Sequence, residues 1–388
     1  MKLFYRTLQI SVLIIVLSGC HGPQSEIHIT SESALSIDVS EVVRKGPFLE
    51  LKDMIDTIEF VILETNGNSL QDMVSSIDVT DKYIYLNDNY KGGGFSIFGR
   101  NGRFVKRLPH GNGPEEMVMT RSFCIDNKKE LLYICDPMAS KLLRLSLDGT
   151  FIDYCQTESM CQEIYCYDDS VLYSIPCYIT SDKEFEMVKT DTSFANYRKW
   201  ILGPQRNRRL RFRTFQAEGD GVNIYKENEV YYLKGSTLIP KYVIKSNSLQ
   251  ELSANEIRNG KDMLADMAEN DCILMNRPQE SSDYLYMPFF SPTLKPRFVY
   301  YSKKTSEMWM DATVEGSLLY GIDCMDVSSS DPRCFIGIVS PYSVIRNLAE
   351  LDSLISKSET EKFRLVKEDD NPIVVIFRLK NDFVQKSK

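Results

Sequence analysis

The most concentrated group of chemically active side chains is a run of arginines, Arg206-Asn207-Arg208-Arg209-Leu210-Arg211-Phe212-Arg213. If this run is extended, Arg209, Arg211 and Arg213 share one face, because successive side chains of a strand point to opposite sides. Guanidinium groups bind carboxylate and phosphate through paired hydrogen bonds. The run therefore predicts a site for an anionic glycan, a peptide carboxylate or a lipid headgroup. The alternative is a solvated loop that pairs with nearby acidic side chains.

A second candidate is the glycine-rich segment Gly111-Asn112-Gly113-Pro114-Glu115-Glu116. Backbone amides of such a loop can hold an anion. However, neither a helix nor a lysine follows, as a phosphate-binding loop would require. Two interpretations remain open: a structural turn between two repeats, or a surface cleft that Glu115 and Glu116 line.

Catalytic and metal-binding sites are hard to assemble from the remaining residues. The chain has 3 histidines: His21, His28 and His110. They leave almost nothing for a histidine zinc site or a Ser-His-Asp triad. Four aspartates recur at equivalent places: Asp78, Asp88, Asp126 and Asp136. Repeated aspartates can bind calcium, but more often they cap turns by accepting backbone N–H groups. We predict no catalytic residue, no metal and no cofactor.

The cysteines favour packing over chemistry. Of the 10 in the chain, all but Cys20 lie beyond the N-terminal region: Cys124, Cys135, Cys155, Cys161, Cys166, Cys177, Cys272, Cys324 and Cys334. This odd-numbered set cannot pair completely within one chain. The spacings in the densest group, from Cys155 to Cys177, do not match a C-x-x-C zinc pattern. We expect buried thiols that act as small hydrophobes, with a disulfide inside the 155–177 group as the alternative.

The N-terminus has the pattern of an export signal. Lys2 and Arg6 precede an apolar stretch, Leu8 to Leu17, which is shorter than the roughly 20 residues that a membrane-spanning helix needs. A charged start, a short apolar core and small residues describe a secretory signal. The next four residues, Leu17-Ser18-Gly19-Cys20, resemble the lipobox of bacterial lipoproteins.

That resemblance implies that the sulfur of Cys20 receives a diacylglycerol, that the signal is cut before Cys20, and that the freed amine is acylated. The chain would then contact membrane lipid through Cys20. The polar residues 21–26 are typical of a tether between the lipid and a folded domain. The alternative is an ordinary secretory signal in which Cys20 falls near the cleavage point by chance.

The elements that must position these residues follow a repeat. Asp126 follows Asp78 by 48 positions, and Gly149 follows Gly102 by 47 positions. Each copy has three short apolar runs that alternate as half-buried strands do. The Asn101-Gly102 and Asp148-Gly149 pairs then predict type I′ hairpin turns that lead into a fourth strand. Four antiparallel strands repeated every 40–50 residues or so describe a propeller blade.

Weaker copies continue the repeat: Ile164–Tyr173 with Met187–Thr190, Val222–Lys234 with Tyr242–Ser246, Tyr284–Phe290 with Arg297–Ser302, and Gly321–Val327 with Cys334–Val339. The strand-like runs Thr57–Glu64 and Ile373–Lys380 form the natural pair to close the ring, which removes free sheet edges. Helical spacing predicts insertions near 249–268 and 343–357.

We therefore predict an all-β fold, a six-bladed β-propeller of four-stranded antiparallel blades with minor helical insertions. It is expected to occupy residues 51–388, after a lipoprotein signal peptide at 1–19 and a lipidated N-terminus and tether at 20–50. Two stacked β-sandwich domains are the alternative.

The chain as a whole resembles the six-bladed β-propeller lipoproteins of Bacteroides-like Gram-negative bacteria, which are distant relatives of NHL-repeat propellers. The matching features are the lipobox at Cys20 and the segments 55–65, 98–105, 111–116 and 371–376. The resemblance implies a propeller at the cell envelope. It implies no activity, because a fold alone does not supply one.

The net charge of −8 argues against a general nucleic-acid binder. We expect a lipid-anchored protein of the cell envelope, at the periplasmic or surface face of the outer membrane. It would act as a non-catalytic scaffold that binds an anionic glycan, a peptide or an envelope protein. The alternative is an envelope enzyme, a lyase or hydrolase of glycans, with its site at the mouth of the propeller channel. A hydrolase of that kind needs paired carboxylates about 5–9 Å apart.

Overall fold

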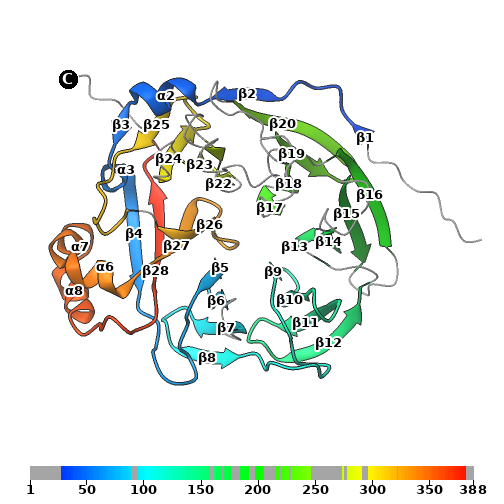
Figure 1. The fold of residues 1–388 in the computed structure, drawn as a ribbon, viewed down its shortest axis with the longest axis horizontal. Helices are drawn as coiled ribbons and strands as arrows, with labels where there is room; N and C mark the ends of the chain where they lie inside the picture. Colours follow the sequence, from blue (N-terminus) through cyan, green and yellow to red (C-terminus); the bar gives the residue numbers. More distant parts are fainter. Residues whose placement is uncertain are drawn as a thin grey trace, which may run out of the picture.

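The structure, a computed structural model, describes residues 28–381 except 89–93, 158–160, 162, 168, 176–183, 192–196, 205–214, 219, 227–228, 246–272, 275–277, 291–295 and 321. In this part of the chain, six β-sheets stand around a common centre as the blades of a propeller (Figure 1). The predicted six-bladed propeller is confirmed, and the alternative of two stacked sandwiches is wrong.

The first three blades follow one another along the chain. Blade one contains β5 (Val74–Val79), β6 (Tyr83–Asp88), β7 (Gly94–Gly99) and β8 (Phe104–Arg107). Blade two contains β9 (Ser122–Asp126), β10 (Leu131–Asp136), β11 (Lys141–Ser146) and β12 (Phe151–Gln156). Blade three contains β13 (Glu163–Tyr167), β14 (Ser170–Ile175), β15 (Glu184–Asp191) and β16 (Tyr197–Pro204). All pairings within these blades are antiparallel.

The other three blades follow in the same order, and blade six also contains a strand from the start of the chain. Blade four contains β17 (Phe215–Glu218), β18 (Gly221–Lys226), β19 (Glu229–Lys234) and β20 (Thr237–Lys245). Blade five contains β21 (Ile273–Leu274), β22 (Gln279–Glu280), β23 (Tyr284–Phe290), β24 (Pro296–Ser302) and β25 (Met308–Asp311). Blade six contains β26 (Asp323–Val327), β27 (Cys334–Val339), β28 (Ile373–Leu379) and β4 (Ile55–Val61).

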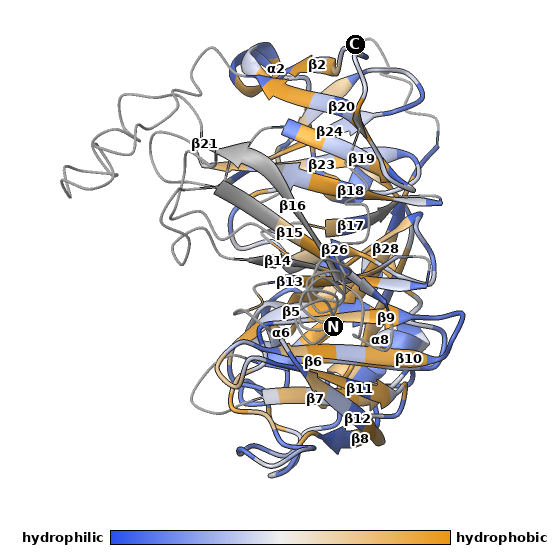
Figure 2. Cartoon of the chain, turned by 90° about the vertical axis from the view of Figure 1, so that its right-hand side faces the viewer, coloured by the Kyte–Doolittle hydropathy of each residue, from blue (hydrophilic) through white to orange (hydrophobic). Residues whose placement is uncertain are grey.

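The middle strands are apolar because neighbouring blades cover both of their faces. In β10, five of the six residues are buried, so the strand does not show a simple alternation of buried and exposed positions. Tyr85 of blade one is fully buried and donates a hydrogen bond to the carbonyl of Leu147 in blade two, 3.0 Å away. Seen from the side, the strands carry most of the hydrophobic colour and the connecting loops most of the hydrophilic colour (Figure 2).

The turns at Gly102 and Gly149 differ from the predicted type I′. That turn needs positive φ at both central residues, but only the glycines have it, at +81° and +82°. Each turn instead closes with a hydrogen bond from the glycine N–H to the carbonyl three residues earlier, Gly99 or Ser146. This arrangement is a tight turn followed by a glycine bulge. It brings each glycine against the preceding blade, where an added Cβ at Gly102 would lie 2.0 Å from the Ile62 carbonyl oxygen.

The two ends of the propeller meet in blade six, as predicted. β4 pairs antiparallel with β28, with Phe60 opposite Val375 and Ile58 opposite Phe377. An ion pair between Asp56 and Arg378 (2.5 Å) joins the same two strands. The ring is therefore closed by strands that are more than 300 residues apart in sequence, with β4 as the outermost strand of blade six.

The predicted tether at 20–50 is wrong for residues 28–50. β1 (His28–Ile29) and β2 (Leu35–Asp38) pair with β20 in parallel, and β3 (Phe48–Leu49) pairs with β25 in the same way. A short helix, α2 (Ser40–Lys45), lies between β2 and β3, and α3 (Leu51–Met54) follows. Ile37, Val39 and Val42 are almost fully buried against blades four and five, so this segment is part of the folded domain.

Helices interrupt the blades in one described place. α6 (Pro341–Arg346), α7 (Leu348–Leu354) and α8 (Lys357–Phe363) lie between β27 and β28, beside blade six (Figure 1). They confirm the helical insertion predicted at 343–357 and extend it. Val344, Leu351 and Phe363 attach them to the apolar core of blades five and six. The helix predicted at 249–268 lies outside the described residues. None of the described helices is long and apolar enough to cross a membrane.

Six cysteines are described with their side chains, all of them as thiols: Cys124, Cys135, Cys155, Cys161, Cys166 and Cys334. The first five pack in one apolar cluster between blades two and three, as the prediction of small buried hydrophobes requires. The predicted alternative, a disulfide within the 155–177 group, is not formed among Cys155, Cys161 and Cys166. Cys177 lies outside the described residues.

Candidate functional site

Of the two candidate segments predicted from the sequence, the structure describes the glycine-rich loop but not the arginine run. Arg209, Arg211 and Arg213 lie outside the described residues, so their role in anion binding stays a prediction. Glu115 and Glu116 are described, on the connection from blade one to blade two. Glu115 is exposed, whereas Glu116 is half-buried and accepts a hydrogen bond from the N–H of Gly113 at 2.8 Å.

The contacts of Glu116 fit the structural interpretation of this loop. Lys141 of blade two donates to the carbonyl oxygens of Gly113 (2.9 Å) and Glu116 (2.5 Å), which ties the loop to the blade. Gly111 has a φ of +156°, and an added Cβ there would lie 2.1 Å from the Glu116 carboxylate. A side chain at Gly111 would displace the Glu116 carboxylate from its place beside the Gly113 N–H, so the glycine fits this form of the turn. Ligand binding by Glu115 and Glu116 stays a prediction.

The base of this loop forms one wall of a pocket. Met117 donates to the carbonyl of Pro109, and Gly111 donates to the carbonyl of Met117, each at 3.0 Å. These bonds hold the two ends of the loop together. Pro109, His110 and Met117 are also among the residues that line a cavity of about 620 Å³, which is formed by blade one and its connection to blade two.

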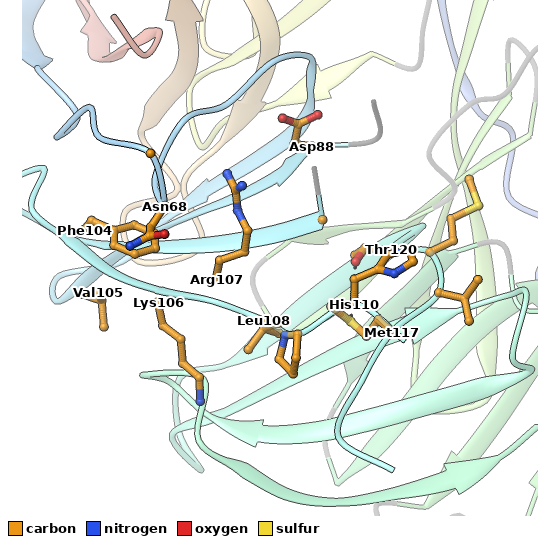
Figure 3. A pocket seen from close by; sticks show the side chains of 15 residues that line it. Asn68, Asp88, Phe104, Val105, Lys106, Arg107, Leu108, His110, Met117 and Thr120 are labelled. Carbon is orange, nitrogen blue, oxygen red and sulfur yellow. Dashed lines mark hydrogen bonds between the residues drawn. The ribbon is translucent and has the colours of Figure 1, made fainter. Parts of the chain in front are cut away.

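Three segments of the chain line the pocket. They are the loop at Gly67 and Asn68, the ends of β6 and β7 at Asp88 and Gly94, and the stretch from Phe104 to Thr120 without the 111–116 loop. Arg107 rises from β8 in the middle of the lining, with Asn68 and Phe104 to one side and His110, Met117 and Thr120 to the other (Figure 3). The site therefore depends on residues that are brought together by the hairpin of blade one and its connection to blade two.

The floor of the pocket is apolar. Leu108 and Met117 are almost fully buried, at 4% and 3% exposure. Phe104 packs edge-on against Phe98, with ring centroids 5.5 Å apart. An apolar floor of this kind accepts a hydrocarbon or aromatic group without an unpaired polar contact.

Two cationic side chains belong to the lining, and they point in opposite directions from β8 (Figure 3). Arg107 donates to the hydroxyl of Ser96 at 3.1 Å and to the carbonyl of Leu70. Lys106 donates to the carbonyl of Gly149 at 3.0 Å. Within the described part of the chain, neither forms an ion pair with a carboxylate. The charge of Lys106 acts on the nearby carboxylate of Asp148, whereas the charge of Arg107 is available to an anionic group in the pocket.

The carboxylate of Asp88, the acidic residue among the described lining residues, is committed to the backbone. Asp88 is 2% exposed and accepts the N–H groups of Asp72 (2.6 Å) and Met73 (3.2 Å). Asp136, its counterpart in blade two, accepts the N–H of Val118 at 2.7 Å and those of two residues in the following turn. The interpretation of these aspartates as backbone caps is confirmed.

Exposed apolar side chains gather around the pocket. Two belong to its lining: Val105 (44% exposed) and Met119 (37%). Two more belong to residues whose backbone bonds to a lining residue: Leu70 (50%) and Met73 (58%). Methionine side chains are flexible and polarisable, and they are over-used at surfaces that adapt to peptides. Grouped exposure of this kind marks interaction sites more often than scattered single residues do.

Sequence reasoning identified the loop beside the pocket but missed its two cations. Lys106 and Arg107 are adjacent in sequence and carry no motif. The feature of the sequence that could have identified them is their place on the fourth strand of the clearest repeat, just before the Gly111–Glu116 segment.

Comparisons with known proteins agree with the fold. A family model described as "Domain of unknown function (DUF4934)" matches residues 34–378. A crystal structure of a protein from Bacteroides fragilis NCTC 9343, provisionally described as exported, superposes with a TM-score of 0.70 at 17% identity, covering 90% of this chain and 100% of that one.

A second crystal structure is that of a DUF4221 family member from Bacteroides vulgatus. It has a TM-score of 0.52 at 10% identity and covers 84% of this chain and 97% of that one. At these identities, the likeness shows a shared fold. No curated protein matches the sequence.

Proposed function

This chain belongs to the DUF4934 family, and we propose that it is an exported, lipid-anchored propeller that binds a protein partner in the cell envelope without catalysis. The observation that carries the binding proposal is the pocket of blade one and its connection to blade two, where Arg107 lies beside an apolar floor and forms no ion pair with a carboxylate among the described residues. The ligand with matching chemistry is a peptide segment with an acidic residue next to a large apolar one.

The envelope location rests on the N-terminal residues. Lys2, Arg6 and the apolar stretch that ends at Leu17 have the composition of an export signal, and Cys20 stands where a lipobox cysteine would stand. The Bacteroides fragilis relative, provisionally described as exported, supports the same location. Acylation of Cys20 would place the propeller at a membrane surface.

The choice of a protein partner rests on the rim of the pocket. The flexible side chains of Met73 and Met119 can repack around a partner's side chains. A glycan-cleaving site would need two carboxylates across the substrate. The described lining offers Asp88, whose carboxylate is already bonded to two backbone N–H groups.

A random peptide library displayed on phage tests this proposal directly. We expect selection on the mature chain to enrich peptides that combine Asp or Glu with Phe, Leu or Met, and we expect the same library to show no enrichment on the Arg107→Gln variant. Arg103→Gln is the matched control, because Arg103 is an exposed arginine of the same hairpin that does not line the pocket. Enrichment that is equal on the wild type and on Arg107→Gln would contradict the proposal.

A further inference from the structure

Two cysteines of neighbouring blades meet at the centre of the cluster between blades two and three. Cys124 lies on β9 and Cys166 on β13, the innermost strands of these blades, and the two side chains face each other from neighbouring blades. Their sulfur atoms are 2.7 Å apart. Non-bonded heavy atoms prefer roughly 3.5–4.0 Å, and a disulfide bond is about 2.05 Å long. The two thiols are thus already closer than ordinary packing would leave them.

The contact is held by the strands on both sides of it. Two residues before the cysteines, the N–H of Ile164 donates to the hydroxyl of Ser122 at 3.2 Å. Beyond them, Lys129 forms an ion pair with Asp169 at 2.7 Å. The strands therefore run side by side in one register, and the sulfur contact is one of three successive links between them.

The other buried thiols of the cluster have different partners. Cys135 donates to the carbonyl of Cys161 at 3.3 Å, and Cys161 donates to the carbonyl of Glu163 at 3.7 Å. For Cys124 and Cys166 the sulfur contact is the interaction that the structure gives. Cys124 is 6% exposed, and burial raises its pKa well above the ordinary range. Cys166 is only half-buried, so it is the more accessible sulfur.

We propose that Cys124 and Cys166 are a disulfide-forming site that is oxidised in the cell envelope by the disulfide of a thiol–disulfide oxidoreductase. The thiolate of Cys166 attacks that disulfide, forming a mixed disulfide and releasing one thiolate of the oxidoreductase. Cys124 loses its proton and displaces the second thiolate, which forms the Cys124–Cys166 bond. Two electrons pass to the oxidoreductase, whose two released thiolates take up the two protons lost by the cysteines.

The bond would add a covalent link between two blades that are otherwise joined by packing, by the Ser122–Ile164 hydrogen bond, by the Lys129–Asp169 ion pair and by the connection after β12. It closes a loop that contains the three outer strands of blade two, and such a closure stabilises a fold mainly by restricting the unfolded chain. This inference goes beyond ligand binding. It shares with the proposed function only the envelope location, where disulfides persist.

The test begins with the purified mature chain, incubated with excess oxidised glutathione, quenched in acid, alkylated and digested without reduction. We expect mass spectrometry to find the peptides of Cys124 and Cys166 linked, with the mass of two hydrogen atoms lost. We also expect the melting temperature to fall by several degrees when the oxidised chain is reduced. Chain taken from the membrane fraction of the producing bacterium, and quenched at lysis, should carry the same link.

Two variants keep the result interpretable. Cys166→Ser should abolish both the linked peptide and the effect of reductant on melting. Cys135→Ser, which removes another cysteine of the same cluster, should leave the linked peptide and the effect of reductant unchanged. The proposal is overturned if Cys124 and Cys166 both carry the alkylating group after treatment with glutathione, or if Cys124 is linked to another cysteine. The linked peptide is read from the wild type, so failure of a variant to fold does not affect it. Detection of the linked peptide also does not depend on peptide binding or on the N-terminal lipid. Those two measurements test the proposed function separately.

Discussion

Lys241 of blade four bridges both carboxylate oxygens of Glu280 in blade five, with its Nζ 2.9 Å from Oε1 and 2.8 Å from Oε2. The Glu280 side chain is completely buried. Lys303 forms a second ion pair with it at 2.8 Å, and Asn223 donates to it at 2.7 Å. Burial alone would raise the pKa of Glu280, but the two lysines outweigh it and hold the pKa below its usual range.

We expect Glu280→Gln to destabilise the protein by roughly 3 kcal/mol at neutral pH, because it leaves two largely buried lysines without their counter-charge. Because the pKa is lowered in the folded state, the stabilisation is fully present above the ordinary glutamate value of about 4.3. It is lost as the pH falls through the lower, folded-state value. Urea unfolding at pH 7 and at pH 3 should therefore show a difference between wild type and variant that shrinks in acid.

The matched control for that experiment is Asp220→Asn. Asp220 forms an exposed ion pair with Lys234, so this variant should unfold almost as the wild type does. A loss of stability in Glu280→Gln that is the same at both pH values would show that the charge of Glu280 is not what matters.

Gly102→Ala should cost more stability than an ordinary glycine substitution. Gly102 has a φ of +81°, and its added Cβ would lie 2.0 Å from the Ile62 carbonyl oxygen, so backbone strain and a clash act together. We expect a loss of about 2–4 kcal/mol in thermal or urea unfolding. Gly235→Ala is the control, because Gly235 also has a positive φ, +62°, but has open space around it. The control should lose only about 1 kcal/mol, and equal losses would rule out the close contact between blades.

The charge of Arg107 should be measurable in the affinity for an acidic peptide. With a peptide obtained from the library selection, we expect Arg107→Gln to weaken binding by roughly tenfold or more, since a charge-assisted hydrogen bond is lost. Arg107→Lys should retain part of the affinity because it keeps the charge but loses the paired geometry. Fluorescence anisotropy at two salt concentrations tests this. Wild-type affinity that does not change with salt would argue against an ionic contact in the pocket.

Cys20→Ala tests the membrane anchor. We expect the wild-type chain to sediment with membranes and to partition into detergent, and the variant to lose this behaviour because it cannot accept a lipid. Mass spectrometry of the N-terminal peptide should show the acyl groups on Cys20 in the wild type. A wild-type peptide that starts elsewhere, or a Cys20 without lipid, would mean that residues 1–19 are not a lipoprotein signal.

The repeat in the sequence was enough to predict the blades and their closure. The offset of 47 or 48 residues between 77–105 and 124–152 located blades one and two, and the strand-like ends at 57–64 and 373–380 located the seam. The short strands β1, β2 and β3 could not be predicted in this way. Each is two to four residues long, so it has no period to detect, and its pairing with β20 or β25 is a long-range contact.

The candidate site was predictable only in part for the same reason. The Gly111–Glu116 segment stands out locally, whereas the pocket needs Asn68, Asp88 and Arg107 to come together from separate parts of blade one. The carboxylate of Glu280 meets Lys241 across a gap of 39 residues between two blades. The Cys124–Cys166 contact likewise joins two blades across 42 residues of sequence, and the two cysteines do not occupy equivalent positions of the repeat that could have indicated it.

The arm formed by β1 and β2 decides where a lipid would hold this molecule. His28 is eight residue steps from Cys20, and an extended chain of that length reaches roughly 28 Å. β1 lies on the outer edge of blade four, which stands across the ring from blade one (Figure 1). An acyl group at Cys20 would therefore attach the propeller to the membrane near the outer edge of blade four. Blade one and its pocket would then lie on the opposite side of the propeller from the point of attachment. A partner can dock there without competing with the bilayer.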